Sequence, residues 1–274
     1  ETDRLLKGGL GKGELGVVVA PTGAGKSMAL VHLGSEAIKK GLNVIHYTLE
    51  LQDTVVASRY DSCITGFSLN SLHGLKDEIY EQIKDMEGGL VVKEYPTKSA
   101  STNTLKLHLE KLRKREIPID MVIVDYGDLL RPVSTQKEKR NELESIYEEM
   151  RGLAQEYECP VWTASQTNRS GLNADVITME SISEAFNKCF VADFICSISR
   201  TADDKVANTA RMFVAKNRNG EDGLVYPMYM DTSRIKIEVL PYQGDTPGSV
   251  AATTAKEQRE KLKEKYKEFK ESRK

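Results

Sequence analysis

The chain has 274 residues, of which 39 are Lys or Arg and 41 are Asp or Glu, so its formal net charge is −2. With 39% hydrophobic and 29% charged residues and no apolar run near the ~18 residues of a spanning helix, the composition excludes a disordered chain and a helical membrane protein. The balanced charge also excludes a protein that holds nucleic acid by bulk positive charge, so any such contact must be local.

Strand and helix patterns alternate over the first part of the chain. Leu15–Ala20 is a short apolar run that ends at a Gly-rich turn, which predicts a buried strand. Positions 27–40 have apolar residues at helical spacing, and Gly41 would cap the helix at its C-terminus. Asn43–Leu49 and Leu90–Glu94 are rich in apolar and β-branched residues and predict the next two strands.

The alternation continues to about position 165. The expected elements are a helix marked by Leu105, Leu109 and Leu112, a strand at Met121–Val124, a helix over 143–154 and a strand at Pro160–Ser165. Between positions 192 and 240 the helical signals vanish and three or four strands follow at hairpin spacing. The predicted fold class is α/β, with a mostly parallel central sheet flanked by helices and C-terminal antiparallel strands.

A phosphate-binding motif lies between the first predicted strand and helix, in the sequence Ala20-Pro21-Thr22-Gly23-Ala24-Gly25-Lys26-Ser27. It matches the Walker A pattern except that Ala stands at its first position. The glycines allow backbone N–H groups to point inward, and the helix N-terminus adds partial positive charge. We expect residues 22–27 to bind a nucleoside triphosphate, with Lys26 reaching the β- and γ-phosphates and the Ser27 hydroxyl binding Mg²⁺.

Hydrolysis also needs an acidic residue near Mg²⁺ and a group that activates water. Asp125 follows MVIV directly and Glu50 follows NVIHYTL, so both lie at strand ends, where parallel sheets bind ligands. We assign Asp125 to Mg²⁺ and Glu50 to the attacking water as its base, with helix capping as the alternative for both. Gln166, after WTAS, would contact the γ-phosphate and a neighbouring loop, unless it is a plain turn residue.

The order of these motifs resembles a known family. A Walker A loop followed by Glu50, Asp125 and Gln166 at successive strand ends is similar to RecA-like ATPases. Within them, VIVDYGDLL, ASQTNRS and AKNRNGEDG resemble the ATPase domain of DnaB-type hexameric replicative helicases, and YPTKSASTNT looks most like the T-even bacteriophage members. The resemblance runs from about Gly8 to Leu240 and implies a RecA-like P-loop NTPase core that uses ATP and Mg²⁺.

In that family ATP lies between adjacent subunits of a ring, and a K-x-R pair from one subunit reaches the γ-phosphate held by the next. Lys216 and Arg218 stand at the matching positions, so the resemblance gives them a catalytic role in trans. A cation from another subunit offsets transition-state charge and makes hydrolysis depend on assembly. Without the resemblance they are two basic residues on one side of a strand, for which a solvated face is the simpler explanation.

DNA contacts in the family fall on loops that face the central channel, and the stretches 131–141 and 167–180 fit such loops. Their candidate residues are Arg131, Lys137, Lys139, Arg140, Asn168 and Arg169. Neither stretch is rich in aromatic residues, so we expect contacts to the phosphates of single-stranded DNA with little sequence preference; plain surface loops are the alternative. Glu184 matches a family position that links a loop to the ATP site, and Arg59 matches one near Glu50, where a structural ion pair explains it equally well.

The sequence departs from the family in two respects. Full-length members carry an N-terminal collar domain and linker, whereas this sequence opens almost directly at the ATPase core, which predicts a fragment or a reduced relative. It also has no zinc-binding primase module, so priming would belong to a partner. We expect a RecA-like domain over 1–245 and a charged, partly disordered or helical tail over 246–274.

The leading hypothesis is the motor of an ATP-driven replicative DNA helicase that translocates on single-stranded DNA and unwinds duplex. The expected partners are single-stranded DNA, further copies in a hexameric ring, and primase and a helicase loader, without a membrane. The expected location is the cytoplasm, that of the host if a bacteriophage encodes the chain. The alternatives are a RecA-type strand-exchange recombinase, disfavoured because the K-x-R region resembles helicases, and a nucleotide-gated scaffold without motor activity.

Overall fold

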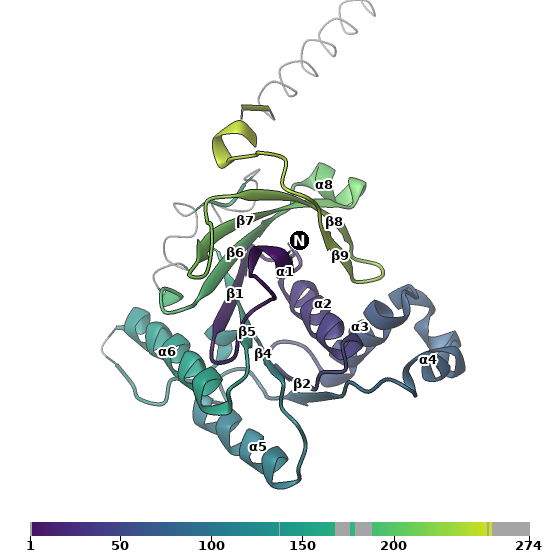
Figure 1. Ribbon diagram of the computed structural model, residues 1–274. Helices are drawn as coiled ribbons and strands as arrows, with labels where there is room; N and C mark the ends of the chain where they lie inside the picture. Colours follow the sequence, from purple (N-terminus) through teal and green to yellow (C-terminus); the bar gives the residue numbers. More distant parts are fainter. Residues whose placement is uncertain (1, 137, 168–175, 179–187, 251, 254–274) are drawn as a thin grey trace, which may run out of the picture.

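The described strands of the molecule form one mixed sheet. The computed structural model describes residues 2–136, 138–167, 176–178, 188–250 and 252–253. In this part of the chain nine strands lie in the order β3-β2-β4-β5-β1-β6-β7-β8-β9 (Figure 1). Their bounds are β1 Leu15–Ala20, β2 Val44–Thr48, β3 Leu90–Glu94, β4 Met121–Asp125, β5 Val161–Gln166, β6 Phe194–Ser199, β7 Thr209–Asn217, β8 Val225–Asp231 and β9 Lys236–Val239. Strands β1 to β6 pair in parallel, and β7, β8 and β9 extend the β6 edge in antiparallel.

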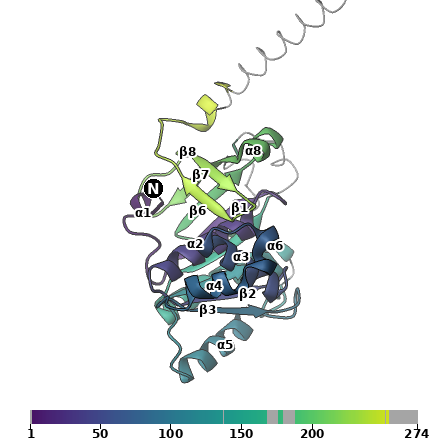
Figure 2. The same cartoon turned by 90° about the vertical axis from the view of Figure 1, so that its right-hand side faces the viewer.

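Helices cover both faces of the parallel strands. Helices α2 (Lys26–Lys39) and α3 (Asp53–Thr65) lie on one face, and α5 (Thr102–Lys114) and α6 (Lys139–Tyr157) lie on the other (Figures 1 and 2). The remaining described helices are α1 Thr2–Leu5, η1 Leu69–Gly74, α4 Lys76–Ile83, η2 Gly127–Leu129 and α8 Ala202–Ala207. None of the helices in the described residues combines the length and the apolar character that crossing a membrane requires.

Strand β1 lies at the centre of the sheet, and every one of its residues is buried. Val17 and Val19 belong to a core shared with α5 and α6, whereas Val18 belongs to a second core shared with α2 and α3. Successive side chains of a strand point to opposite faces, so a strand that is apolar throughout requires cover on both sides. Because the neighbouring strands run parallel, their carboxyl ends meet at one edge of the sheet.

The predicted fold class is confirmed, and the predicted strands before residue 190 differ from the observed ones by at most one residue at either end. Gly41 follows α2 with a φ of 82°, as expected of a helix-terminating glycine. No helix was predicted between residues 50 and 90, although Val56, Tyr60 and Cys63 are the buried, helically spaced residues of α3.

The prediction that helical structure is absent between 192 and 240 was wrong. Helix α8 lies there, and it begins with a capping box in which the Thr201 and Asp204 side chains accept from each other's backbone N–H groups at 3.2 and 2.9 Å. A helix of this length has too few apolar residues to produce a periodic signal. Of the predicted tail, residues 247–250 are helical, and most of the remainder lies outside the described residues.

Candidate nucleotide site

The phosphate-binding motif forms the turn between β1 and α2, as predicted. Gly23 and Gly25 have φ values of 74° and 103°, in the left-handed region that glycine adopts without strain. A Cβ at Gly25 would also lie 2.1 Å from the Cε of Met230, at the end of β8, so this position has no room for a side chain. The loop backbone is therefore shaped by its glycines and covered by the antiparallel extension of the sheet.

Lys26, the first residue of α2, is the buried cation of this turn, with 8% of its surface exposed. Its Nζ lies 3.4 Å from the carbonyl oxygen of Pro21 and 5.6 Å from the centre of the Tyr126 ring. Burial lowers the pKa of the Lys26 amine, and the negative charges of Glu50 and Asp125 partly oppose this shift. A desolvated ammonium in a Gly-rich loop is suited to an anionic ligand such as a polyphosphate.

Asp125, the last residue of β4, lies deep beside the loop. Its side chain is fully buried, and neither carboxylate oxygen has a hydrogen-bond partner among the described residues. Burial raises the pKa of Asp125 to about 6, while the nearby Ser27 hydroxyl acts in the opposite direction. Buried polar atoms are normally partnered, so these oxygens, with the Ser27 hydroxyl nearby, are suited to a cation or its water. Ser27 and Asp125 fit Mg²⁺, a hard cation that takes oxygen ligands from one or two side chains, phosphates and water.

Glu50 lies beside Asp125 because β2 and β4 are parallel neighbours with Thr48 opposite Asp125. Its side chain is exposed and lines a cavity of about 380 Å³, together with the phosphate-binding loop and Arg59 of α3. Burial lowers the pKa of Arg59, and the charges of Asp125 and Glu50 oppose that shift. An exposed carboxylate at the mouth of the cavity is accessible to water, which a general base requires.

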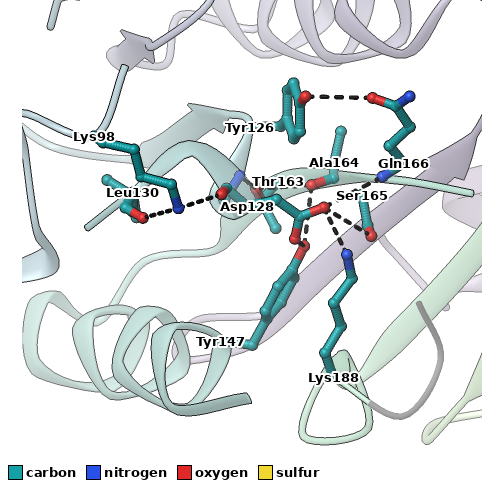
Figure 3. Close-up of polar contacts among 11 residues, drawn as sticks. Lys98, Tyr126, Asp128, Leu130, Tyr147, Thr163, Ala164, Ser165, Gln166 and Lys188 are labelled. Atoms are coloured by element: carbon teal, nitrogen blue, oxygen red, sulfur yellow. Dashed lines mark hydrogen bonds and ion pairs between the residues drawn. The ribbon is translucent and has the colours of Figure 1, made fainter. Parts of the chain in front are cut away.

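Gln166, the last residue of β5, contacts the phosphate-binding loop directly. Its Nε2 donates to the Thr22 Oγ1 at 2.7 Å, and its Oε1 accepts from the Tyr126 hydroxyl at 3.3 Å. Figure 3 shows Tyr126 and Gln166 facing each other above the end of β5. The structure thus brings together Lys26, Glu50, Asp125 and Gln166, as expected for the ends of parallel strands.

Three residues that line the far side of the cavity were not predicted from the sequence: Arg200, Lys205 and Thr232. Arg200 follows β6 and donates to the carbonyl oxygens of Thr209 at 3.1 Å and Met230 at 3.0 Å. Arg200 could have been predicted, because it directly follows β6, which is parallel to β1 and ends at the same edge of the sheet. Lys205 and Thr232 come from α8 and the β8–β9 turn, whose positions depend on the antiparallel extension.

Lys216 and Arg218 lie at the opposite edge of the sheet from the cavity. Strand β7 is antiparallel to β6, with Lys216 opposite Ile195 near the start of β6. The Arg218 guanidinium contacts the carboxylate of Asp193 at 3.0 Å. This edge is separated from the cavity by the length of β1, ~20 Å for a strand of this size, so neither side chain reaches the cavity of its own chain.

The candidate DNA contacts are only partly described. Lys137, Asn168, Arg169 and Glu184 lie outside the described residues. The predicted loop 131–141 is shorter than expected because α6 begins at Lys139, so the backbone of Lys139 and Arg140 belongs to the first turn of a helix. Arg131 and Arg140 are exposed. Whether any of these residues contacts DNA stays a prediction.

A parallel sheet with a Walker A loop after β1 and acidic or amide side chains after β2, β4 and β5 defines a P-loop nucleotide-binding protein with a RecA-like core. Residues 1–235 match the profile of the DnaB-like helicase C-terminal domain, and the chain belongs to that family.

Relatives in the same family are similar over much of this chain. It is 29% identical over 232 residues to the DnaB-like replicative helicase of Enterobacteria phage T4, covering 80% of this chain and 49% of that protein. It is 26% identical over 172 residues to the replicative DNA helicase DnaB of Helicobacter pylori, covering 61% of this chain and 35% of that protein. The chain thus spans half or less of the length of these relatives.

Solved structures share the fold. One of them, described as an ATPase domain, superposes with a TM-score of 0.74 at 17% identity, covering 87% of this chain and 88% of that one. A DnaB-like replicative helicase, studied with its interactions with primase, gives a TM-score of 0.74 at 17% identity, covering 87% of this chain and 61% of that one. The predicted resemblance to DnaB-type helicases and the RecA-like core are therefore confirmed.

Proposed function

We propose that this chain is the ATP-driven motor of a replicative DNA helicase, which acts as a hexameric ring, translocates on single-stranded DNA and unwinds duplex. The observation that carries the proposal is the position of Lys216 and Arg218 at the amino edge of the sheet, away from the cavity at the carboxyl edge. We call the phosphate-binding loop with Lys26, Glu50 and Asp125 the cradle, and Lys216 and Arg218 the cation pair. A chain with its cradle at one edge and its cation pair at the other is suited to a ring in which each cation pair contacts the ATP bound by the neighbouring chain.

The residues of the cradle divide the chemistry between them. The loop N–H groups and Lys26 hold the β- and γ-phosphates, and Ser27 and Asp125 hold Mg²⁺. When bound, Mg²⁺ offsets charge on the phosphate oxygens. Glu50 takes a proton from the attacking water at the open side of the cavity, and Gln166 orients toward the γ-phosphate while it remains in contact with Thr22.

Lys216 and Arg218 of the adjacent subunit complete this site. Cations that arrive from a second subunit stabilise the charge that develops during phosphoryl transfer, and such a contribution is worth ~10³–10⁵ in rate. Hydrolysis therefore depends on assembly, which prevents ATP consumption by isolated chains. Residues 1–245 form the motor unit, and its DNA contacts come from Arg131, Lys137, Lys139, Arg140, Asn168 and Arg169, mainly to phosphates.

The partners follow from the same function. A primase is a candidate partner because one structural neighbour was studied with its interactions with primase, and a helicase loader is a second candidate because a closed ring needs help to enclose DNA. The site of action is the cytoplasm, that of the host if a bacteriophage encodes the chain.

A subunit-mixing experiment tests the trans arrangement. The Lys26→Ala variant lacks a working cradle, and the Arg218→Ala variant lacks the arriving cation, so each should be inactive alone. In a mixture, a Lys26→Ala subunit supplies its intact Arg218 to the intact cradle of an Arg218→Ala neighbour, and DNA-stimulated ATP turnover should partly return. No recovery at any mixing ratio would contradict a shared site.

Two further measurements separate a helicase from the alternatives. Unwinding of a forked duplex coupled to ATP hydrolysis is expected of the motor and of neither a strand-exchange protein nor a scaffold. Mass measurement with a non-hydrolysable ATP analogue and a single-stranded oligonucleotide should give hexamers; long polydisperse assemblies would favour a recombinase filament instead.

A further inference from the structure

A short segment between the nucleotide cradle and the Lys216/Arg218 pair contacts both. Residues 188–193, here called the 188–193 segment, directly precede β6. At its beginning, the Nζ of Lys188 lies 2.6 Å from the Oδ2 of Asp128, and the two side chains are only 11% and 14% exposed. An ion pair this well buried holds its two partners in one relative position, since separating them would leave an uncompensated charge.

Asp128 in turn lies against the end of β5 (Figure 3). Its Oδ1 accepts from the Tyr147 hydroxyl at 2.9 Å, and its Oδ2 lies 3.5 Å from both the backbone nitrogen of Gln166 and the Oγ of Ser165. Gln166 contacts Thr22 of the phosphate-binding loop. Polar contacts therefore run from Lys188 through Asp128 to the backbone of Gln166, whose side chain contacts the phosphate-binding loop.

The same segment holds both members of the cation pair at the other edge of the sheet. The backbone carbonyl of Phe190 accepts from the Nζ of Lys216 at 2.5 Å, and the Phe190 ring lies 4.5 Å from that Nζ. Asp193 contacts the Arg218 guanidinium at 3.0 Å, and its backbone carbonyl accepts from the Arg218 N–H at 2.9 Å.

The middle of the segment is packed firmly against the core. Cys189 and Ala192 are fully buried, and the Ala192 N–H donates to the Cys189 carbonyl at 2.8 Å. Asp193 also accepts the Leu15 N–H at 3.0 Å and a bidentate contact from Arg151 at 3.1 Å. Because packed interiors transmit displacement rather than absorb it, a shift at one end of this segment reaches the other.

We propose that the 188–193 segment couples the chain's own nucleotide state to the position of Lys216 and Arg218, and thereby to hydrolysis at the neighbouring site. This inference rests on the proposed function, because it requires the cation pair to act in trans. Movement of Gln166 with the γ-phosphate shifts the Asp128–Lys188 ion pair, and the segment carries that shift to the carbonyl of Phe190 and the carboxylate of Asp193. Lys188 and Asp128 are positioning residues, since they act through Gln166 and the cation pair.

Rings assembled from wild-type and variant chains distinguish an effect of Lys188 on the neighbouring site from an effect on the cradle of its own chain. A Glu50→Gln chain still binds ATP but hydrolyses it poorly, so its own cradle keeps a nucleotide state and a second change can lower turnover only by acting on the neighbour. We compare wild-type chains mixed with Glu50→Gln chains and wild-type chains mixed with Glu50→Gln/Lys188→Met chains. Turnover per wild-type site should be lower by ~2- to 30-fold in the second mixture, the range of measured coupling effects. Equal turnover in the two mixtures would overturn the proposal.

Two reference mixtures calibrate the result. Glu50→Gln/Arg218→Ala chains, which present no arginine to the neighbour, set the lowest turnover. If that mixture equals the one with Glu50→Gln alone, the cation does not act in trans and the proposed function fails, whatever Lys188 does. Glu50→Gln/Lys106→Met chains are the matched control, because the Lys106 Nζ contacts Glu156 at 2.6 Å, in an ion pair between α5 and α6 away from the 188–193 segment. Their turnover should equal that of the Glu50→Gln mixture.

A binding measurement covers the case in which Glu50→Gln chains stop turnover altogether. The affinity of the wild-type sites for a fluorescent non-hydrolysable ATP analogue is measured in mixtures in which Lys26→Ala replaces Glu50→Gln, so that the partner chains bind none of the analogue. It should weaken with Lys188→Met in the neighbour and return with Lys188→Arg, which keeps the charge. Should Lys188→Met alone prevent folding, Asp128→Asn/Lys188→Met removes both charges together and is expected to fold. Unchanged affinity and unchanged turnover with either variant would overturn the coupling.

Discussion

At the carboxyl edge of the parallel strands the charged groups face a cavity, whereas at the amino edge they face one another. Asp125 is buried without a hydrogen-bond partner among the described residues, and burial lowers the pKa of the Lys26 amine beside it. At the other edge Asp193 contacts both Arg151 and Arg218 and also accepts a backbone N–H. The charges of the first edge are available to a ligand, whereas those of the second are already paired within the fold.

This difference indicates what each edge is built to do. Unpartnered buried charge costs stability, so its retention at the carboxyl edge points to a site that a polyphosphate and a cation complete. A charge that is paired within the fold lowers stability little, and its partner holds the side chain in place. The amino edge therefore holds Lys216 and Arg218 in a defined position, from which they can contact a neighbouring subunit. Three variants test the carboxyl-edge half of this contrast and a fourth tests a candidate DNA contact; they are taken in order of decreasing expected effect.

The largest effect is expected from Lys26→Ala, which removes the buried cation of the cradle. Turnover should fall by at least ~10³-fold, because both phosphate binding and charge stabilisation are lost. ATP turnover and binding of a fluorescent ATP analogue measure this. Lys39→Ala, at the exposed end of the same helix and paired only with Glu36 in the described ion pairs, is the control and should behave as wild type. Retained hydrolysis in Lys26→Ala would refute the phosphate assignment.

Glu50→Gln should separate binding from chemistry at the carboxyl edge. The amide keeps the shape of the side chain but cannot accept the proton of water, so kcat should drop by ~10²–10⁴-fold while nucleotide affinity stays near that of wild type. Single-turnover kinetics and equilibrium binding distinguish the two quantities. The control is Glu94→Gln, a carboxylate at the end of the neighbouring strand β3. Undiminished turnover would remove Glu50 from the mechanism.

Asp125→Asn should show that the buried carboxylate of Asp125 lowers the unfolding free energy of the protein. Burial raises the folded-state pKa of Asp125 from 3.8 to about 6, so the folded state binds this proton more tightly than the unfolded state. The wild type should therefore lose ~3 kcal/mol of unfolding free energy as the pH rises from about 4 to about 6.

The Asn variant has no such group and should lack this loss, while it loses Mg²⁺-dependent turnover. Urea unfolding at pH 4, 5, 6 and 7 without nucleotide gives the comparison. Parallel pH curves for the two proteins would contradict a raised pKa at Asp125.

The smallest effect is expected from Arg140→Gln, which tests whether the exposed start of α6 contacts DNA. Loss of one phosphate contact should weaken binding to single strands of any sequence alike and reduce the slope of log affinity against log salt by ~1. Arg113→Gln, in the last turn of α5, is the control. A salt dependence that is the same in both variants and the wild type would place the DNA contact elsewhere.

Prediction from the sequence worked best where the signal is local. The turn at Gly23 and Gly25 and the placement of Lys26 and Ser27 depend on neighbouring residues, and the strand-end positions of Glu50, Asp125 and Gln166 depend on apolar runs that directly precede them. It failed for Lys205 in the cavity wall, because α8 carries too few apolar residues to be recognised. Arg200 was also not predicted, although it directly follows a strand that ends at the same edge of the sheet.

The order of amino acids alone specifies the P-loop, the parallel strands and the set of polar residues at their carboxyl ends, because each is encoded within a few consecutive residues. Tertiary packing, in contrast, places Lys216 and Arg218 at the far edge, since this depends on β7 reversing direction against β6. It also brings Asp128 and Lys188, 60 positions apart, together beneath Gln166. Such contacts arise from the packing of distant segments, and no local pattern of residues specifies them.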